Sequence, residues 1–235
     1  MFREVNFPKL KILNLMCMGI SDINVFEKVN FKELKELNIA SNKIEDINVF
    51  ERVKFPKLEK LMLERNKIES IQVFEQVNFK ELKELDMSNN EITDINVLEK
   101  VNFQRLNKLS FSSNKITDIN ILKSCNFPLL TDLSLNHNEI SNISVIKEVN
   151  FKQLSYLNLE NNKITNITAL KGNNIPLLKT LVLAHNLISD ISIFERMDYQ
   201  KSQLTNLYLD DNKINKKINS ALINKLRWKI KNFSI

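Results

Sequence analysis

The feature that most constrains this chain is a 24-residue repeat that runs through nearly all of its 235 residues. Each unit follows the pattern Leu-x-x-Leu-x-Leu-x-x-Asn-x-Ile, with other apolar residues at the third leucine position in some copies. Nine copies follow one another. A fixed period of this length indicates units that stack on their neighbours. The opening leucines are Leu10, Leu34, Leu58, Leu82, Leu106, Leu130, Leu154, Leu178 and, after a two-residue insertion, Leu204.

The Leu-x-Leu alternation within each unit predicts a short strand with one face directed inward. An asparagine follows each strand after two residues, and its side-chain amide can satisfy backbone groups where the chain turns out of the strand. We therefore interpret this column as a buried ladder that holds the fold, not as a functional site. Its members are Asn42, Asn66, Asn90, Asn114, Asn138, Asn162, Asn186 and Asn212.

A second polar column contains only residues that commonly cap helix N-termini. Each member precedes an apolar run, so a short helix or helical turn is expected to begin there. The column consists of Asp22, Asp46, Ser70, Asp94, Asp118, Asn142, Asn166 and Asp190. The phenylalanines are equally periodic, which favours an internal spine over a platform for stacking nucleic-acid bases. That column is Phe7, Phe31, Phe55, Phe79, Phe103, Phe127 and Phe151, and the phase of residues 1–7 matches residues 25–31.

This pattern resembles the leucine-rich-repeat superfamily over nearly the whole chain. The further apolar positions Ile44, Ile47, Phe50 and Val53 resemble the subclass typified by the leucine-rich regulator of protein phosphatase-1, although each unit here has two extra residues. The resemblance implies an α/β repeat fold: a right-handed solenoid with a parallel concave sheet of about nine strands and short helices or helical turns on the convex side. It does not imply a phosphatase partner, because many functions share this repeat.

The two ends of the chain differ from the repeats between them. Residues 213–235 contain seven basic residues and no acidic ones, and subtracting them from 34 leaves 27 basic against 28 acidic residues in 1–212. We interpret residues 1–212 as the solenoid and residues 213–235 as an amphipathic capping helix, since a solenoid needs an atypical terminal unit. Its apolar stripe would be Ile218, Leu222, Leu226, Ile230 and Phe233. Because Trp228 falls off that stripe, binding of a membrane surface or nucleic acid by this basic helix is kept as an alternative.

The N-terminal unit is degenerate, with Met18 in place of the ladder asparagine. The chain opens inside a repeat, so the strand near Ile12 to Met16 would be an open edge through which copies could associate. We expect a monomer or weak self-association there. The first residues lack a basic region followed by an apolar run, and no stretch approaches a membrane span of about 18 apolar residues. A cytoplasmic location is therefore expected.

Catalysis and metal binding are not expected. Cys17 and Cys125 stand 108 positions apart without a Cys or His cluster, and Cys125 takes the place of valine in a packed column. The only histidines, His137 and His185, occupy one column two repeats apart. Two strand spacings of about 4.8 Å would separate them by roughly 10 Å, too far to share a metal at bond lengths near 2 Å. No cofactor and no small-molecule substrate is implied.

Function should lie in the columns that vary, which are the outward positions of the sheet. In the last four units these carry both histidines and two of the three tyrosines, together with apolar and acidic groups, a composition typical of recognition hot spots. The candidate partner-binding residues are His137, Tyr156, Asn158, Glu160, Val182, His185, Tyr208, Asp210 and Asp211. The sequence thus predicts a non-catalytic module that binds another protein. Nine strands offer a projected area of order 500 Å², so loops would have to contribute to a standard interface of about 800 Å² per partner.

Overall fold

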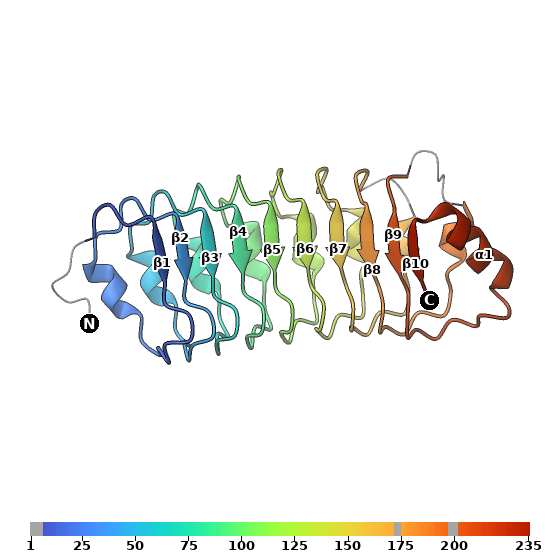
Figure 1. Cartoon of the computed structure of the whole chain (residues 1–235), viewed down its shortest axis with the longest axis horizontal. Coiled ribbons are helices and arrows are strands. Elements are labelled where there is room, and N and C mark those ends of the chain that lie inside the picture. The colour runs from blue at the N-terminus through green and yellow to red at the C-terminus, as the bar shows by residue number, and fades with distance from the viewer. Residues whose placement is uncertain (1–6, 172–174, 197–201) are drawn as a thin grey trace.

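Ten short strands lie side by side in one parallel sheet in the computed structural model of this chain (Figure 1). The structure describes residues 7–171, 175–196 and 202–235, so the predicted match of residues 1–6 to a repeat lies outside the described residues. The strands are β1 (Ile12–Asn14), β2 (Glu36–Asn38), β3 (Lys60–Met62), β4 (Glu84–Asp86), β5 (Lys108–Ser110), β6 (Asp132–Ser134), β7 (Tyr156–Asn158), β8 (Thr180–Val182), β9 (Asn206–Tyr208) and β10 (Asn232–Ser234).

The sheet keeps a single register along its length. Equivalent leucines lie opposite one another in successive strands, for example Leu85 opposite Leu109 and Leu109 opposite Leu133. Leu181 of β8 still lies opposite Leu207 of β9, although 26 residues separate them instead of 24. The predicted solenoid and its register are therefore confirmed, and each repeat presents the same backbone to its neighbour.

The helices on the opposite face of the sheet are all short 3-10 helices in the repeats that the structure describes. They are η1 (Asn24–Lys28), η2 (Asn48–Glu51), η3 (Gln72–Glu75), η4 (Asn96–Glu99), η5 (Asn120–Lys123), η6 (Ser144–Lys147), η7 (Thr168–Leu170) and η8 (Ser192–Arg196). The predicted capping column lies one residue before the N-cap position. In the second repeat, for example, the N-cap of η2 is Ile47, whereas the column member is Asp46. Asp46 nevertheless accepts the backbone N–H of Asn48 at 2.7 Å, so its side chain organises the first turn as expected.

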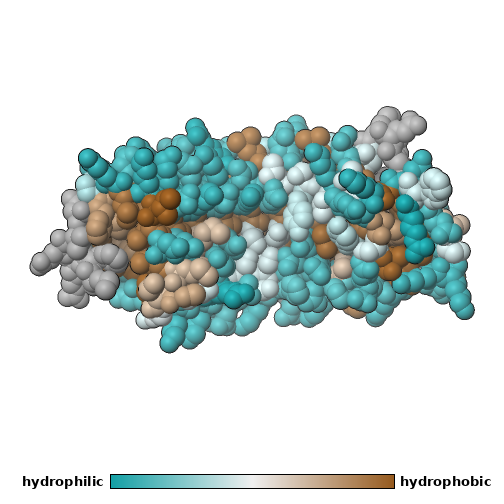
Figure 2. Space-filling view, viewed as in Figure 1, coloured by the Kyte–Doolittle hydropathy of each residue, from teal (hydrophilic) through white to brown (hydrophobic). Residues whose placement is uncertain are grey.

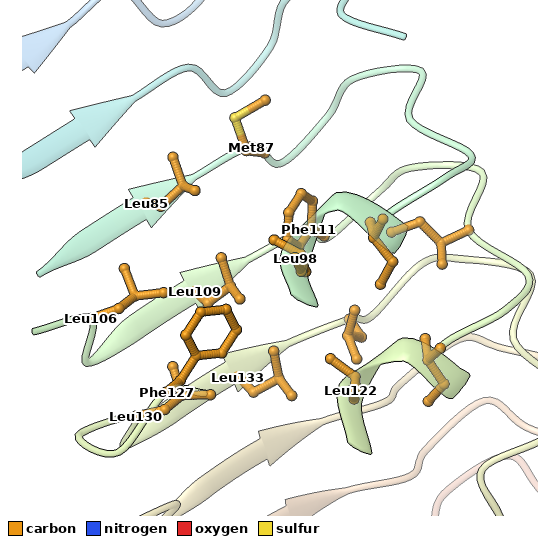
Figure 3. Close-up of a cluster of buried hydrophobic side chains, with 14 of the residues drawn as sticks. Leu85, Met87, Leu98, Leu106, Leu109, Phe111, Leu122, Phe127, Leu130 and Leu133 are labelled. Atoms are coloured by element: carbon orange, nitrogen blue, oxygen red, sulfur yellow. The ribbon is translucent and has the colours of Figure 1, made fainter. Parts of the chain in front are cut away.

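The core fills the space between the sheet and the 3-10 helices. Leu109, Phe111 and Leu133 reach inward from the strands and meet Leu122 of η5 (Figure 3), and all four are fully buried. The phenylalanine column forms the predicted spine, with Phe55 stacked on Phe79 at 6.4 Å between ring centres and Phe127 on Phe151 at 6.3 Å. The periodic apolar side chains are thus buried where successive repeats stack.

The asparagine ladder is confirmed by its hydrogen bonds. The Nδ2 of Asn114 donates to the carbonyls of Met87 and Phe111 at 3.0 and 3.1 Å. Its Oδ1 accepts the N–H of Ile92 at 3.0 Å. One buried side chain therefore satisfies backbone groups of two adjacent repeats, which explains why the position is asparagine in eight units.

Ion pairs also join equivalent positions of neighbouring repeats. The carboxylate of Glu59 lies between Lys35 and Lys83, with Oε–Nζ distances of 2.7 and 2.6 Å. These two hydrogen bonds lower the pKa of Glu59 to about 2 from its usual 4.5. A group whose pKa is lowered by folding stabilises the protein above its unfolded pKa, and that contribution disappears as the pH falls through the folded value.

We therefore expect Glu59→Gln to lower the thermal midpoint at pH 7 by about 2–4 °C, corresponding to roughly 1 kcal/mol for a well-formed surface pair. The difference from the wild type should shrink below about pH 4.5 and vanish near pH 2. Circular-dichroism melts across this range measure it, with Glu69→Gln as the control because Glu69 is exposed later in the same repeat. A difference that persists unchanged at pH 2 would contradict this account.

The C-terminal segment closes the solenoid in a way that the sequence predicts only in part. Helix α1 (Ser220–Lys229) buries Leu222, Ile223 and Leu226 and packs against η8 and β10. Two of the residues assigned to its apolar stripe lie elsewhere, since Ile218 precedes the helix and is 80% exposed, and Phe233 belongs to β10. β10 pairs with β9 and extends the sheet to ten strands, one more than expected.

The N-terminal end of the sheet carries exposed apolar side chains. Ile12 and Met16, on and beside β1, are 58% and 42% exposed, and no described strand pairs with the free side of β1. Figure 2 shows apolar surface gathered at this end of the sheet. Within the described residues, no helix has both the length and the apolar character needed to span a bilayer.

Candidate functional site

The outward side chains of the repeats that contain β6 to β9 form one surface, which we call the C-terminal sheet face. It has four carboxylates, Asp132, Glu160, Asp210 and Asp211, and no lysine or arginine. This local charge is opposite to the net charge of +6 of the whole chain. Its sixteen positions are Asp132, Ser134, Asn136, His137, Tyr156, Asn158, Glu160, Asn161, Thr180, Val182, Ala184, His185, Asn206, Tyr208, Asp210 and Asp211.

Tyr156 projects from β7 and is half-buried, so one side of its ring is available for contact. Its hydroxyl accepts a hydrogen bond from Nδ2 of Asn158 at 3.2 Å. The Oδ1 of Asn158 accepts the backbone N–H of Glu160 at 3.0 Å. Asn158 is only 9% exposed and holds Tyr156 and the turn after β7 in place, and its role as a contact residue stays a prediction.

Val182 and Tyr208 continue the same row of the sheet. Asn158 lies opposite Val182, Val182 opposite Tyr208, and Tyr208 opposite Ser234 of β10. Val182 and Tyr208 are half-buried, and the row therefore presents a mixed apolar and hydroxyl strip. Asp210 accepts a hydrogen bond from the Ser234 hydroxyl, so the unexpected tenth strand is tied directly to this surface.

His137 and His185 are both exposed, and their shared column has a backbone property that the sequence did not reveal. Nine non-glycine residues at this position adopt φ between 50° and 59°, including His137 at 55°, His185 at 54° and Asp211 at 51°. Asn, Asp and His tolerate this left-handed region better than most residues. The left-handed backbone therefore favours histidine in this column independently of any role in binding.

The histidines have different neighbours. Nδ1 of His185 lies 3.4 Å from Oδ2 of Asp211, and its Nε2 lies 4.0 Å from Oε1 of Glu160. Nδ1 of His137 is 2.6 Å from Nδ2 of Asn161. Among the described residues, no group of three or more His, Cys, Asp or Glu side chains is arranged to hold a metal ion. His185 thus lies between carboxylates of two repeats.

The middle of the sheet contains a chain of hydroxyls that the sequence analysis passed over. The Oγ of Ser88 lies 2.7 Å from that of Ser110, which lies 3.0 Å from that of Ser112, and Ser112 donates to Asn136 Oδ1 at 2.6 Å. These small side chains satisfy one another. The alternation of serine at two outward positions of adjacent repeats was the available signal.

Cys125 has the packed role that was predicted. It is buried in the valine column, and its thiol donates to the carbonyl of Ile121 at 3.5 Å. Burial raises the pKa of the Cys125 thiol to about 12, with a further contribution from Glu99. Because the thiolate is the reactive form, this cysteine is held in its unreactive state at neutral pH.

A hollow of about 510 Å³ lies away from the C-terminal sheet face, where the chain runs from the asparagine ladder toward η2 and η3. Carboxylates line it, and the Nζ of Lys67 is 3.3 Å from Oε1 of Glu45. The side chain of Asp46 is one of those already used to organise the 3-10 turns. The full lining is Glu45, Asp46, Ile47, Asn48, Lys67, Glu69, Ser70 and Glu91.

Comparison with known protein families gives a match that covers more than half of the chain. The family model described as "Leucine Rich repeats (2 copies)" matches residues 32–76, 56–100, 80–124 and 128–172. A comparison with curated proteins gave no match. The family match concerns the repeat itself, and the phosphatase-regulator-like subclass stays a prediction.

Three of the solved structures that match this fold are from Listeria monocytogenes and Leptospira interrogans. An internalin C2 of Listeria monocytogenes aligns with a TM-score of 0.70 at 24% identity, covering 84% of this chain and 80% of its own. A second internalin from Listeria monocytogenes aligns at 0.56 and 24% identity, covering 92% and 71%. A leucine-rich-repeat protein of Leptospira interrogans aligns at 0.51 and 22% identity, covering 92% and 64%. At these identities the likeness extends to the fold alone.

Proposed function

The chain belongs to the leucine-rich-repeat family, and on that premise we propose that it is a non-catalytic module that binds another protein on its C-terminal sheet face. The observation that carries this proposal is the difference between columns. Periodic residues are buried in the core or in the ladder, or they form ion pairs between repeats on the surface. The two tyrosines, by contrast, break the column pattern, occupy outward positions of the sheet and are half-buried.

The chemistry of this surface supports a protein partner. Tyrosine rings held in place lose little conformational freedom on binding, and their hydroxyls can still form hydrogen bonds. Tyr156 is held by Asn158, and Tyr208 lies between Val182 and Ser234. Val182 and Tyr208 in one row of the sheet, with Tyr156 in the adjacent row and carboxylates nearby, have the composition of an interface core with a polar rim.

The experiment is affinity capture from a lysate of the source organism with the wild type and the Tyr156→Ala/Tyr208→Ala variant. We expect the double variant to lose the captured partner, because hot-spot tyrosines contribute a tenfold or larger share of affinity each. Its thermal midpoint should fall by only a few degrees, since both side chains are half-exposed.

A matched control tests whether any disturbance of the sheet has the same effect. Glu36→Ala/Lys60→Ala changes two half-buried outward residues at the other end of the same sheet. This control should retain the partner. Capture that survives the double tyrosine variant, or that the control abolishes equally, would place the binding site elsewhere.

Three narrower predictions of the sequence analysis stay predictions: a cytoplasmic location, association through the N-terminal edge, and binding of an anionic surface by the basic C-terminal segment. The exposed side chains of Ile12 and Met16 bear on the prediction of association through the N-terminal edge. The exposure of Trp228 on α1 bears on the third.

A further inference from the structure

The outer side of α1 is a second surface with unusual exposure. Trp228, the only tryptophan of the chain, is 90% exposed, and it stands between Arg227 and Lys229. The inner side of the same helix is buried through Leu222, Ile223 and Leu226, so capping the solenoid does not account for this tryptophan. We call Arg227, Trp228 and Lys229 the α1 outer patch.

The cations of the α1 outer patch lack acidic neighbours in their own segment, since residues 213–235 contain no Asp or Glu. No ion pair of Arg227 or Lys229 is found within the part of the chain that the structure describes. The neighbouring Lys225 differs, because its Nζ donates to the carbonyl of Glu195 at 2.9 Å and ties α1 to η8. The patch therefore presents uncompensated positive charge around an exposed aromatic ring.

The C-terminal sheet face has the opposite charge and a complementary composition. Its four carboxylates are accompanied by no lysine or arginine, and its tyrosines offer aromatic surface for a tryptophan and a guanidinium. We infer that the occupant of this face is α1 of a second copy of the chain, with the α1 outer patch of each copy docked on the C-terminal sheet face of the other. The inference rests on the proposed function, whose site it uses.

The whole of α1 and the C-terminal sheet face have similar lengths. A ten-residue helix is about 15 Å long, and the three spacings from β6 to β9 span about 14 Å. α1 lies directly beyond β10 at the end of the sheet (Figure 1), so the two patches of one copy are adjacent but do not cover one another. A two-fold arrangement can therefore bring both pairs of patches together at once.

A two-fold dimer would also bury more area on each copy than the sheet face alone provides. A two-fold interface uses the same surfaces on both copies, so each copy contributes its helix patch and its sheet face. The helix patch adds to a sheet that alone falls short of the roughly 800 Å² per partner of a standard interface. A second copy thus supplies the additional contact that a flat ligand on the sheet would lack.

The test is sedimentation velocity of the purified full chain over a range of concentrations. We expect a monomer–dimer equilibrium that weakens as salt is raised from about 0.05 M to about 0.5 M, because screening shortens the reach of charge attraction. Trp228→Ala and Arg227→Glu/Lys229→Glu should each raise the dimer dissociation constant by about tenfold or more. Lys32→Glu/Lys152→Glu, which changes the same amount of charge at exposed lysines of the repeats, should leave it nearly unchanged.

Exchanging the charges of the two surfaces tests their pairing most directly. Glu160→Lys/Asp211→Lys should also weaken the dimer by about tenfold or more, since it repels the α1 outer patch. Combining these two changes with Arg227→Glu/Lys229→Glu in one chain should restore dimerisation, because the attraction is rebuilt with its signs reversed. Failure of the fourfold variant to recover, while its circular-dichroism spectrum matches the wild type, would overturn the pairing of these two surfaces.

Other outcomes identify other occupants and reject this one. A strict monomer at all concentrations overturns the inference, and binding of that monomer to phosphatidylserine vesicles through Trp228 would assign α1 to a lipid surface. A dimer that is lost in Ile12→Lys/Met16→Lys but kept in the α1 variants would assign association to the N-terminal edge. Lysate capture by the Arg227→Glu/Lys229→Glu variant separates the two proposals: a partner still held through Tyr156 and Tyr208 leaves the proposed function standing without the dimer.

Discussion

Replacing Asn114 with alanine is expected to destabilise the protein by about 3–5 kcal/mol, although the substitution removes no apolar contact. The side chain of Asn114 is 8% exposed and forms hydrogen bonds to the backbone of two repeats. Alanine leaves the buried N–H of Ile92 without a partner, which costs about 1–3 kcal/mol. It also removes one of the two amide hydrogen bonds to each of the carbonyls of Met87 and Phe111, which keep Asn90 and Asn138 as donors, and each lost bond adds about 0.5–1.5 kcal/mol.

Urea unfolding monitored by circular dichroism measures the effect as a shift of the midpoint at constant slope. Asn126→Ala is the matched control, because Asn126 is exposed later in the same repeat, and its effect should stay within about 0.5 kcal/mol. A loss of less than about 1 kcal/mol for Asn114→Ala would contradict the ladder as a principal source of stability. A lower slope would instead indicate that the solenoid separates into halves that unfold independently.

Leu226→Ala is expected to cost about 2–5 kcal/mol, whereas Trp228→Ala two residues later should change stability by no more than about 0.5 kcal/mol. Leu226 is fully buried on the inner side of α1, and Trp228 is 90% exposed on the outer side of the same helix. The larger side chain is therefore the less important one for folding. Denaturant unfolding of both variants measures the contrast, and each serves as the control for the other.

Hydrogen exchange locates the effect of Leu226→Ala within the chain. Because each repeat contacts only its neighbours, loss of the cap should first expose the amides of β10 and β9, while β4 and β5 keep their protection. A uniform loss of protection along the chain would show that the cap does not act locally. A strong destabilisation by Trp228→Ala would show that its ring packs on the solenoid, and this would also weaken the case for the α1 outer patch.

Most of the fold could be predicted from the sequence because its repeats impose the same requirement many times over. The leucines, the ladder asparagines and the phenylalanine spine recur with one period, so each column can be assigned by what its members share. The same reasoning failed where a residue occurs once. Phe233 has a spacing from Ile230 that suits a helix, yet it lies in β10, where the polar–apolar alternation from Asn232 to Ile235 is too short to mark a strand.

The candidate surface was less predictable, because outward direction along a strand says little about accessibility. Asn158 occupies an outward position, but its amide is used by Tyr156 and the following turn. The left-handed backbone of the histidine column was also hidden, since its nine members include cysteine, serine and arginine as well as the favoured Asn, Asp and His. Only the backbone geometry shows that these residues share a conformational constraint.

The unbroken register between β8 and β9 has a consequence for how such a chain can change its length. Two surplus residues precede Leu204, yet Asn212 still accepts the N–H of Ile188 and donates to the carbonyl of Leu183. Insertions before a strand are therefore absorbed by the connecting segment, whereas an insertion between a strand and its asparagine would separate the amide from its partners. We therefore expect related chains to differ by whole repeats or by residues in these connecting segments.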